Sequence, residues 1–142
     1  MTEGDKIRAL VAGRLDQAAE ALAAADLNLA NGLLRSAVNR AYYAMFYGVL
    51  ALLATRQMET SRHSGAIAQF DKLFVHPALM PQEMSRWLHE AFVHRQAADY
   101  GADVMLPADE IAGLLAHARD FVERVRQFLQ SHPADKPNAV VE

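Results

Sequence analysis

The sequence contains no cysteine. Disulfide bonds, thiol nucleophiles and zinc sites built on thiolates are therefore excluded. The first residues, Met-Thr-Glu-Gly-Asp-Lys, do not form the basic and apolar regions of a signal peptide. The longest apolar stretch, residues 41–54, spans about 14 residues and is too short to cross a bilayer. These absences predict a cytoplasmic protein that has no membrane segment.

An excess of positive charge is also absent. The chain has 14 Lys and Arg against 17 Asp and Glu, so its formal net charge is −3. This balance excludes binding to nucleic acid by bulk charge alone, although it leaves room for a local basic patch on a mildly acidic body. The sequence also lacks a glycine-rich phosphate-binding loop.

Two histidines invite comparison with a helical zinc site. His89 and His94 enclose the run Glu-Ala-Phe-Val, which is one residue longer than in the zinc-protease motif. Histidines that share a metal ion on a helix are four residues apart, whereas a spacing of five turns them roughly 140° apart. The spacing therefore predicts no metal site, and the sequence indicates no cofactor.

The apolar pattern predicts helices and no β-strand. At 142 residues, of which 52% are hydrophobic, the chain has the size and apolar content of one domain. Apolar residues recur with the helical period, a polar break falls at residues 26–28, and Gly101 is a plausible helix stop. We predict an all-α, antiparallel bundle of about five helices over residues 1–132 and a flexible tail over residues 133–142. The predicted helices cover residues 3–25, 29–55, 62–75, 81–99 and 107–129.

The second predicted helix carries the most information. Its second half is apolar nearly all round, which is typical of a buried central helix. One stripe consists of small residues that let another helix approach closely, and it is also a candidate dimer face: Ala37, Ala41, Ala44, Gly48 and Ala51. Another stripe is polar and aromatic: Ser36, Arg40, Tyr43 and Tyr47. Because buried polar groups need hydrogen-bond partners, this second stripe is expected to face something other than pure core.

A second polar cluster lies at the end of the fourth predicted helix. Arg95 and Asp99 are four residues apart and can form an ion pair, and Gln96 and Tyr100 share that spacing. If this helix packs against the second one, Arg40 and Arg95 belong to one polar patch. Two planar guanidinium groups could bind phosphate there. The patch could equally be an internal or dimer-interface network, so both interpretations stay open.

Three segments, in this order along the chain, resemble the HEPN domain family. Residues 36–47 (Ser-Ala-Val-Asn-Arg-Ala-Tyr-Tyr-Ala-Met-Phe-Tyr) resemble its signature helix. Residues 62–70 (Arg-His-Ser-Gly-Ala-Ile-Ala-Gln-Phe) resemble its next segment, and residues 95–101, which end in Asp-Tyr-Gly, resemble the third. The resemblance covers roughly residues 5–130 and is closest to the branch often encoded beside minimal nucleotidyltransferases.

The resemblance implies a helical bundle that forms a homodimer, with the polar patch near the dimer cleft. It also implies a role in prokaryotic conflict systems, often as the toxin of a toxin–antitoxin pair whose partner is a minimal nucleotidyltransferase. Active members are metal-independent endoribonucleases that use an arginine followed, four to six residues later, by a histidine. Arg95 fits the arginine, but Asp99 and Tyr100 stand where the histidine is expected, and the next histidine is His117.

Three functions follow from these observations. The first is a module that pairs with a nucleotidyltransferase and binds nucleotide or RNA, and the absence of the expected histidine favours it. Its predicted binding residues are Arg40, Tyr43, Tyr47, Arg95, Gln96, Asp99 and Tyr100. The second is an endoribonuclease toxin in which Arg95 acts with a substitute for the missing histidine, namely His94, His63 or Tyr100. The third is a structural dimer that binds no ligand, and a related hypothesis has a partner transfer a nucleotide onto Tyr100.

Overall fold

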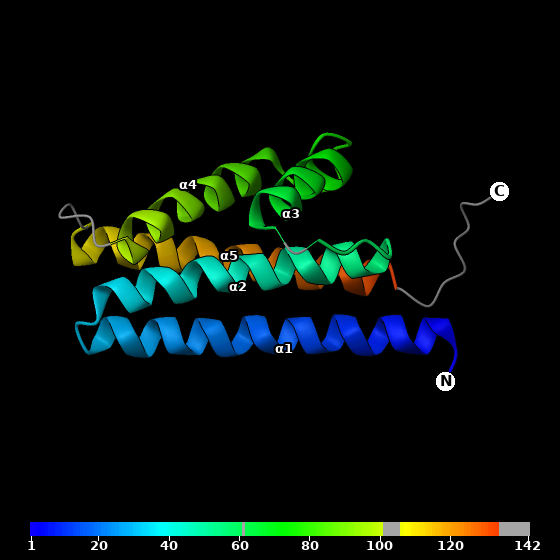
Figure 1. The fold of residues 1–142 in the computed structure, drawn as a ribbon, viewed down its shortest axis with the longest axis horizontal. Helices are drawn as coiled ribbons and strands as arrows, with labels where there is room; N and C mark the ends of the chain where they lie inside the picture. Colours follow the sequence, from blue (N-terminus) through cyan, green and yellow to red (C-terminus); the bar gives the residue numbers. More distant parts are fainter. Residues whose placement is uncertain (61, 101–105, 134–142) are drawn as a thin grey trace.

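The protein is a bundle of helices in the computed structural model (Figure 1). The structure describes residues 1–60, 62–100 and 106–133, and none of these forms a β-strand. The elements in chain order are α1 (Glu3–Ala30), α2 (Leu34–Thr55), α3 (His63–Phe70), the π-helical turn η1 (Asp71–Val75), α4 (Gln82–Asp99) and α5 (Ala108–Ser131). The predicted all-α bundle is therefore confirmed. The helix stop at Gly101 and nearly all of the predicted tail lie outside the described residues.

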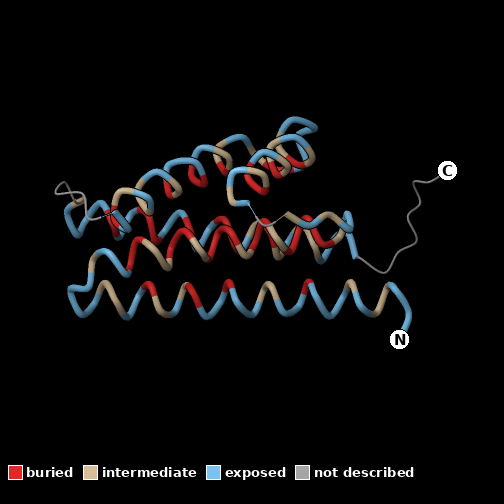
Figure 2. Tube along the Cα trace, viewed as in Figure 1, coloured by how far each residue is buried: buried red, intermediate tan, exposed pale blue. Residues whose placement is uncertain are grey.

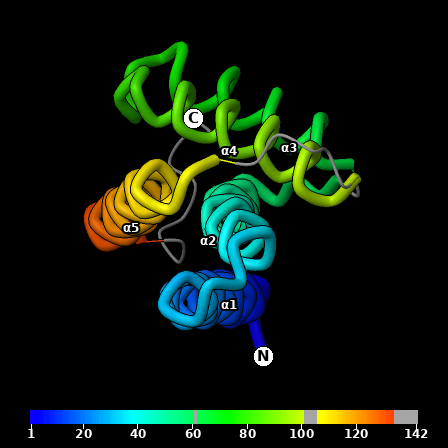
Figure 3. The backbone as a smooth tube through the Cα atoms, turned by 90° about the vertical axis from the view of Figure 1, so that its left-hand side faces the viewer, coloured from blue at the N-terminus to red at the C-terminus, as the bar shows by residue number. Residues whose placement is uncertain are grey.

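Helix α2 lies at the centre of the bundle and packs against α1, α3, α4 and α5. Helices α1 and α2 run antiparallel and side by side, while α3 and α4 cover the side of α2 that faces away from α1 (Figure 1 and Figure 3). Buried residues face this interior, and the outer face of α1 is exposed (Figure 2). No helix in the described part of the chain is apolar over a length sufficient to cross a membrane.

The small residues of α2 are covered by other helices of the same chain. Ala44 packs with small residues of α1 and with Val122 of α5, and Ala51 packs with Val11 of α1. The predicted close approach of another helix is therefore confirmed. The proposal that this stripe is a dimer face is wrong, because α1 and α5 already bury it. Its four alanines have no exposed surface: Ala37, Ala41, Ala44 and Ala51.

Gly48 offers a test of this packing. A Cβ atom there would lie 3.5 Å from Cγ2 of Val125 and 3.6 Å from Cε1 of Phe121, both ordinary contact distances. Gly48→Ala is therefore expected to raise the free energy of unfolding by up to about 1 kcal/mol, because alanine favours a helix more than glycine does. Gly48→Leu is expected to lower it by about 1–3 kcal/mol, because the larger side chain overpacks this contact. Urea unfolding followed by circular dichroism measures both changes, and a leucine variant of unchanged stability would contradict the close packing.

The connection between α1 and α2 falls later than predicted. The sequence placed the break at residues 26–28, but these residues are helical. Asp26 lies on the surface, where its carboxylate forms an ion pair with Arg119 of α5 at 2.8 Å. The turn comes at Gly32, whose φ of +72° is readily adopted by glycine. The prediction took residues 26–28 for a loop because they are polar. A helical turn that faces solvent is polar as well, so polarity alone does not separate the two.

The later helix boundaries agree more closely with the prediction. Pro81 and Pro107 directly precede α4 and α5, as expected for residues that open a helix. The third predicted helix is divided, because α3 passes into the π-helical turn η1. A pattern with a period of 3.6 residues does not reveal such a turn, since the apolar residues remain on the same face. Just before α3, the hydroxyl of Thr60 accepts a hydrogen bond from the Arg62 N–H at 3.2 Å.

Candidate functional site

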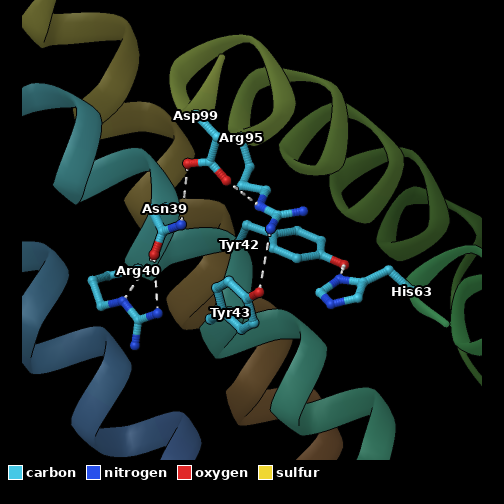
Figure 4. Close-up of polar contacts among 7 residues, drawn as sticks. All are labelled: Asn39, Arg40, Tyr42, Tyr43, His63, Arg95 and Asp99. Atoms are coloured by element: carbon cyan, nitrogen blue, oxygen red, sulfur yellow. Dashed lines mark hydrogen bonds and ion pairs between the residues drawn. The ribbon is translucent and has the colours of Figure 1, made fainter. Parts of the chain in front are cut away.

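Polar side chains from α2 and α4 meet on one side of the bundle (Figure 4). The two helices pack against each other. Arg95 and Asp99 are four residues apart, and Asn39 and Arg40 precede Tyr43 by four and three residues, which places each of these pairs on one face of its helix. We call this group the arginine patch. Its members are Asn39, Arg40 and Tyr43 of α2 and Arg95 and Asp99 of α4.

Arg95 is held in place from three directions. Its Nε atom lies 2.7 Å from Oδ2 of Asp99, which confirms the predicted ion pair. One terminal nitrogen donates a hydrogen bond to the Tyr43 hydroxyl at 3.3 Å. The guanidinium carbon lies 5.6 Å from the ring centre of Tyr42 and 5.4 Å from that of Tyr43. Carboxylate and aromatic faces together stabilise a cation whose side chain is only 22% exposed.

The Nε atom of Arg95 is buried and has no hydrogen bond of good geometry, although Asp99 lies within ion-pair distance. The contact between the two side chains is thus electrostatic rather than a well-aligned fork. A fully formed bidentate pair would leave few N–H donors of Arg95 for a ligand. The observed pair holds the guanidinium group in position without using all of its donors.

Arg40 approaches the same aromatic ring from α2. Its guanidinium carbon lies 4.9 Å from the ring centre of Tyr43. Its Nε atom and one terminal nitrogen donate to Oδ1 of Asn39 at 3.1 and 2.9 Å, and Asn39 in turn donates to Asp99 at 3.4 Å. No carboxylate in the described residues pairs with Arg40, and its remaining terminal nitrogen points away from the network (Figure 4).

A histidine from α3 adjoins the patch. The Nδ1 atom of His63 lies 2.7 Å from the hydroxyl of Tyr42. The imidazole also stacks on Phe46, with ring centres 4.3 Å apart and planes 5° from parallel. Burial, and secondly the positive charge of Arg95, lower the pKa of His63, so its imidazole is neutral at pH 7. Burial raises the pKa of Tyr42, and this phenol therefore stays protonated.

The structure brings together only some of the residues that the sequence singled out. Arg40, Tyr43, Arg95 and Asp99 lie in one network, whereas Tyr47 contacts it only through the Tyr43 ring, with ring centres 5.9 Å apart. In the described part of the chain, three predicted side chains make no hydrogen bond, ion pair or ring contact. They are His94, Gln96 and Tyr100, and Tyr100 is 85% exposed.

Three residues of the site were not among the predicted binding residues: Asn39, Tyr42 and His63. Tyr42 lies on the buried face of α2, outside the polar stripe from which the binding residues on that helix were predicted. His63 lies in one of the segments that carry the family resemblance, and the sequence analysis named it as a possible substitute for the missing histidine of a nuclease. Among the described residues, no group of three or more His, Cys, Asp or Glu side chains could hold a metal ion. The site instead offers guanidinium, phenol and imidazole groups, which suit an anionic ligand.

The fold and the site define an all-helical protein with an arginine patch between α2 and α4. The HEPN domain family model matches residues 11–129, and the chain therefore belongs to the HEPN family.

Relatives cover most of the same region. A UPF0332 protein of Thermotoga maritima is 35% identical over 114 residues, which is 80% of this chain and 86% of that protein. Two proteins of Methanocaldococcus jannaschii are each named "Putative toxin". One is 34% identical over 87% of this chain and 92% of its own length. The other is 36% identical over 67% of this chain and 65% of its own.

Proposed function

We propose that this chain is the toxin-like member of a two-protein system and binds RNA or nucleotide phosphates through its arginine patch. The observation that carries the proposal is the convergence of two guanidinium groups on one ring, at 4.9 Å for Arg40 and 5.4 Å for Arg95 from the centre of Tyr43. The names of the two archaeal relatives support the toxin-like role. We assign the function to one domain over residues 1–132, located in the cytoplasm.

The charge balance of the patch supports an anionic ligand. Two cations face one carboxylate, Asp99, so the patch keeps a local positive charge on a chain whose net charge is −3. Two like charges close together repel, and their repulsion falls when an anion binds between them. Arginine forks match the oxygens of phosphate, and the partly buried rings of Tyr43 and Tyr47 can contact a base or sugar. Among the other predicted binding residues, Gln96 and Tyr100 are exposed to solvent.

The partners proposed from the resemblance are a second copy of the chain and a minimal nucleotidyltransferase. Two exposed residues, one on α4 and one directly after it, support a protein partner at the C-terminal end of this helix. Val93 is 60% exposed and Tyr100 at the C-cap is 85% exposed. They are seven residues apart and therefore lie on one stripe of the helix. The open hydroxyl of Tyr100 also leaves it accessible to nucleotide transfer by such a partner.

Arginine substitutions test the binding site. Arg95→Ala and Arg40→Ala are each expected to weaken binding of a fluorescein-labelled, random-sequence single-stranded RNA by roughly three- to tenfold, measured by fluorescence anisotropy. Each is also expected to reduce the slope of log Kd against log salt concentration by about one, because each arginine neutralises one phosphate.

Arg86→Ala is the matched control for charge. Arg86 is exposed on α4, nine residues before Arg95 and half a turn round the helix from it. Its removal is expected to leave the affinity within twofold of the wild type, roughly the effect of one distant surface charge. Equal losses of RNA affinity in all three variants would show that RNA binds through non-specific charge rather than through the arginine patch. A lower melting temperature with unchanged affinity in Arg95→Ala would favour the structural network instead.

A further inference from the structure

A groove lies between the turn that joins η1 to α4 and the C-terminal half of α5. We call it the turn–α5 groove. We propose that it is a docking site for a partner protein, which inserts a short segment that carries apolar side chains beside lysine or arginine. The groove is separate from the arginine patch, and the inference goes beyond the proposed binding of RNA.

Two adjoining cavities form the turn–α5 groove. One has a volume of about 790 Å³ and is lined by the turn. The other, of about 560 Å³, is lined by the turn and by α5. Leu79, Met80 and Pro81 line both cavities. Phe128 of α5 extends the apolar lining, and its ring packs edge-on against buried Phe74 with ring centres 5.8 Å apart. A concave surface of this size with an apolar lining is typical of a binding site.

The backbone of the turn holds Leu79 on the surface. Ala78 has a φ of +65°, which is uncommon for a residue other than glycine. The N–H groups of Leu79 and Met80 both donate to the carbonyl oxygen of Phe74, each at 2.9 Å. Met80 lies in the core, at 4% exposed, whereas Leu79 is 41% exposed. Because hydrogen bonds already fix the turn, a partner that covers Leu79 meets a small cost of ordering.

The α5 side of the groove carries negative charge. Asp120 makes no hydrogen bond or ion pair within the described part of the chain, and Glu123 accepts a hydrogen bond only from Gln127, at 3.3 Å. We call these two carboxylates the acidic rim. Arg124 also lines the groove, but it is paired with Glu83 at 3.3 Å. The acidic rim therefore favours a segment that carries positive charge.

The other charged groups nearby leave the acidic rim uncompensated. Arg119 and Arg126 line a neighbouring groove between α5 and α1, where Arg119 pairs with Asp26 at 2.8 Å. No ion pair joins either arginine to the acidic rim in the part of the chain that the structure describes. His76 and His132 also line the turn–α5 groove, and they oppose a cationic segment only in acidic solution, where histidine is protonated.

The ligand class of the groove differs from that of the arginine patch. Carboxylates repel the phosphates of RNA, whereas an apolar lining beside them suits a basic and apolar protein segment. The groove adjoins the start of α4 at Gln82, and the patch includes the last residue of that helix, Asp99. These two residues are roughly 25 Å apart along the helix axis (Figure 1). The two surfaces can therefore be occupied at the same time.

The test uses the full chain and three fluorescein-labelled peptides of equal length. The basic probe is Gly-Leu-Lys-Leu-Leu-Lys-Gly. An acidic twin has glutamate in place of each lysine, and a polar twin has serine in place of each leucine. Fluorescence anisotropy is measured at about pH 8, where ordinary histidine is neutral. The wild type is expected to bind the basic probe at least about tenfold more tightly than either twin.

A leucine variant tests the apolar part of the groove. Leu79→Ser is expected to weaken binding of the basic probe about tenfold, because the probe loses apolar contact area. Leu27→Ser is the matched control, since Leu27 is a leucine of α1 that is 63% exposed and lies outside the groove. Its affinity for the basic probe is expected to stay within about twofold of the wild type, the effect of a distant surface change.

A double variant tests the acidic rim. Asp120→Asn combined with Glu123→Gln is expected to weaken binding of the basic probe by about three- to tenfold, and less so at high salt, because two exposed charge interactions are lost. Asp16→Asn combined with Glu20→Gln changes the net charge equally on the exposed face of α1. This control is expected to leave the affinity within about twofold. Circular dichroism confirms that every variant is folded.

The possible failures of the two proposals differ. Equal binding of the three peptides, or equal losses in the groove and control variants, would overturn the docking site and leave RNA binding by the arginine patch untouched. Absence of RNA binding would overturn the proposed function and leave the docking site standing. RNA affinity in Leu79→Ser is expected to stay within about twofold of the wild type, because the groove is distant from the patch.

Two other occupants of the groove are outcomes of the same experiment. A lower oligomeric state of Leu79→Ser, measured by size-exclusion chromatography with light scattering, would identify a second copy of the chain as the occupant. A variant that lacks residues 134–142 and binds the basic probe at least about tenfold more tightly would identify the chain's own C-terminal residues. Either result would overturn the assignment of the groove to a partner protein.

Discussion

Tyr42→Ala is expected to lower the free energy of unfolding by about 3–5 kcal/mol, the range found when a large buried aromatic side chain is removed. Tyr42 has no exposed surface. Its ring packs against three other aromatic rings, with centres 5.3–5.8 Å apart: Tyr43, Phe46 and Phe92. The substitution leaves a cavity at the centre of α2, which neighbouring helices fill only in part because protein interiors are close-packed.

The matched control for this prediction is Tyr42→Phe. Phenylalanine keeps every ring contact and removes only the hydroxyl that lies 2.7 Å from His63. A loss of about 1 kcal/mol is expected, the usual value for one hydrogen bond whose other partner can bind water instead. Urea unfolding followed by circular dichroism measures both variants at one pH. Similar losses for alanine and phenylalanine would mean that the hydroxyl, not the ring, stabilises this part of the core.

Asp99→Asn is expected to strengthen RNA binding about tenfold, equivalent to about 1.4 kcal/mol of binding free energy. The carboxylate of Asp99 lies 2.7 Å from Arg95 and competes with any anionic ligand for that guanidinium group. Asparagine is nearly the same size and retains an oxygen that can accept the hydrogen bond from Asn39. The contact with Asn39 is retained, the ion pair with Arg95 is lost, and the local positive charge of the patch rises.

The same substitution is expected to change stability little. The Arg95–Asp99 ion pair is partly exposed, at 22% and 35% of the side chains, and such pairs contribute about 0–1 kcal/mol. Asp99 is also the last residue of α4, where a negative charge interacts unfavourably with the helix dipole by about 0.3–1 kcal/mol. Removing the charge therefore loses the ion pair with Arg95 but also removes the unfavourable interaction with the helix dipole.

Glu83→Gln is the control for Asp99→Asn. Glu83 pairs with Arg124 at 3.3 Å, so its neutralisation also releases an arginine. Sixteen residues of helix α4, roughly 24 Å, separate it from Asp99. The RNA affinity of the Glu83→Gln variant is expected to rise less than twofold, because charges at this distance are screened in physiological salt. Fluorescence anisotropy at fixed salt concentration measures both variants. Equal gains would show that net charge, rather than the patch, governs binding.

The part of the site that lies within one helix could be predicted from the sequence. Arg95 and Asp99 are four residues apart, and a helix alone brings such residues together. Their ion pair was predicted and is observed at 2.7 Å. The partner of Arg40 was not predicted. It is the adjacent Asn39, whose amide bridges to Asp99 over 60 residues of sequence, and no spacing rule identifies such a bridge.

The sequence by itself determined the helices, the central position of α2 and the pairing of Arg95 with Asp99, because each depends on residues within a few turns of one another. Only the tertiary structure decided that α1 and α5 cover the small residues of α2 and that His63 reaches Tyr42. Contacts of that kind join residues 21, 52 or 60 positions apart. Which side chains meet there depends on how the helices pack and rotate against each other, and the local pattern of the chain leaves that open.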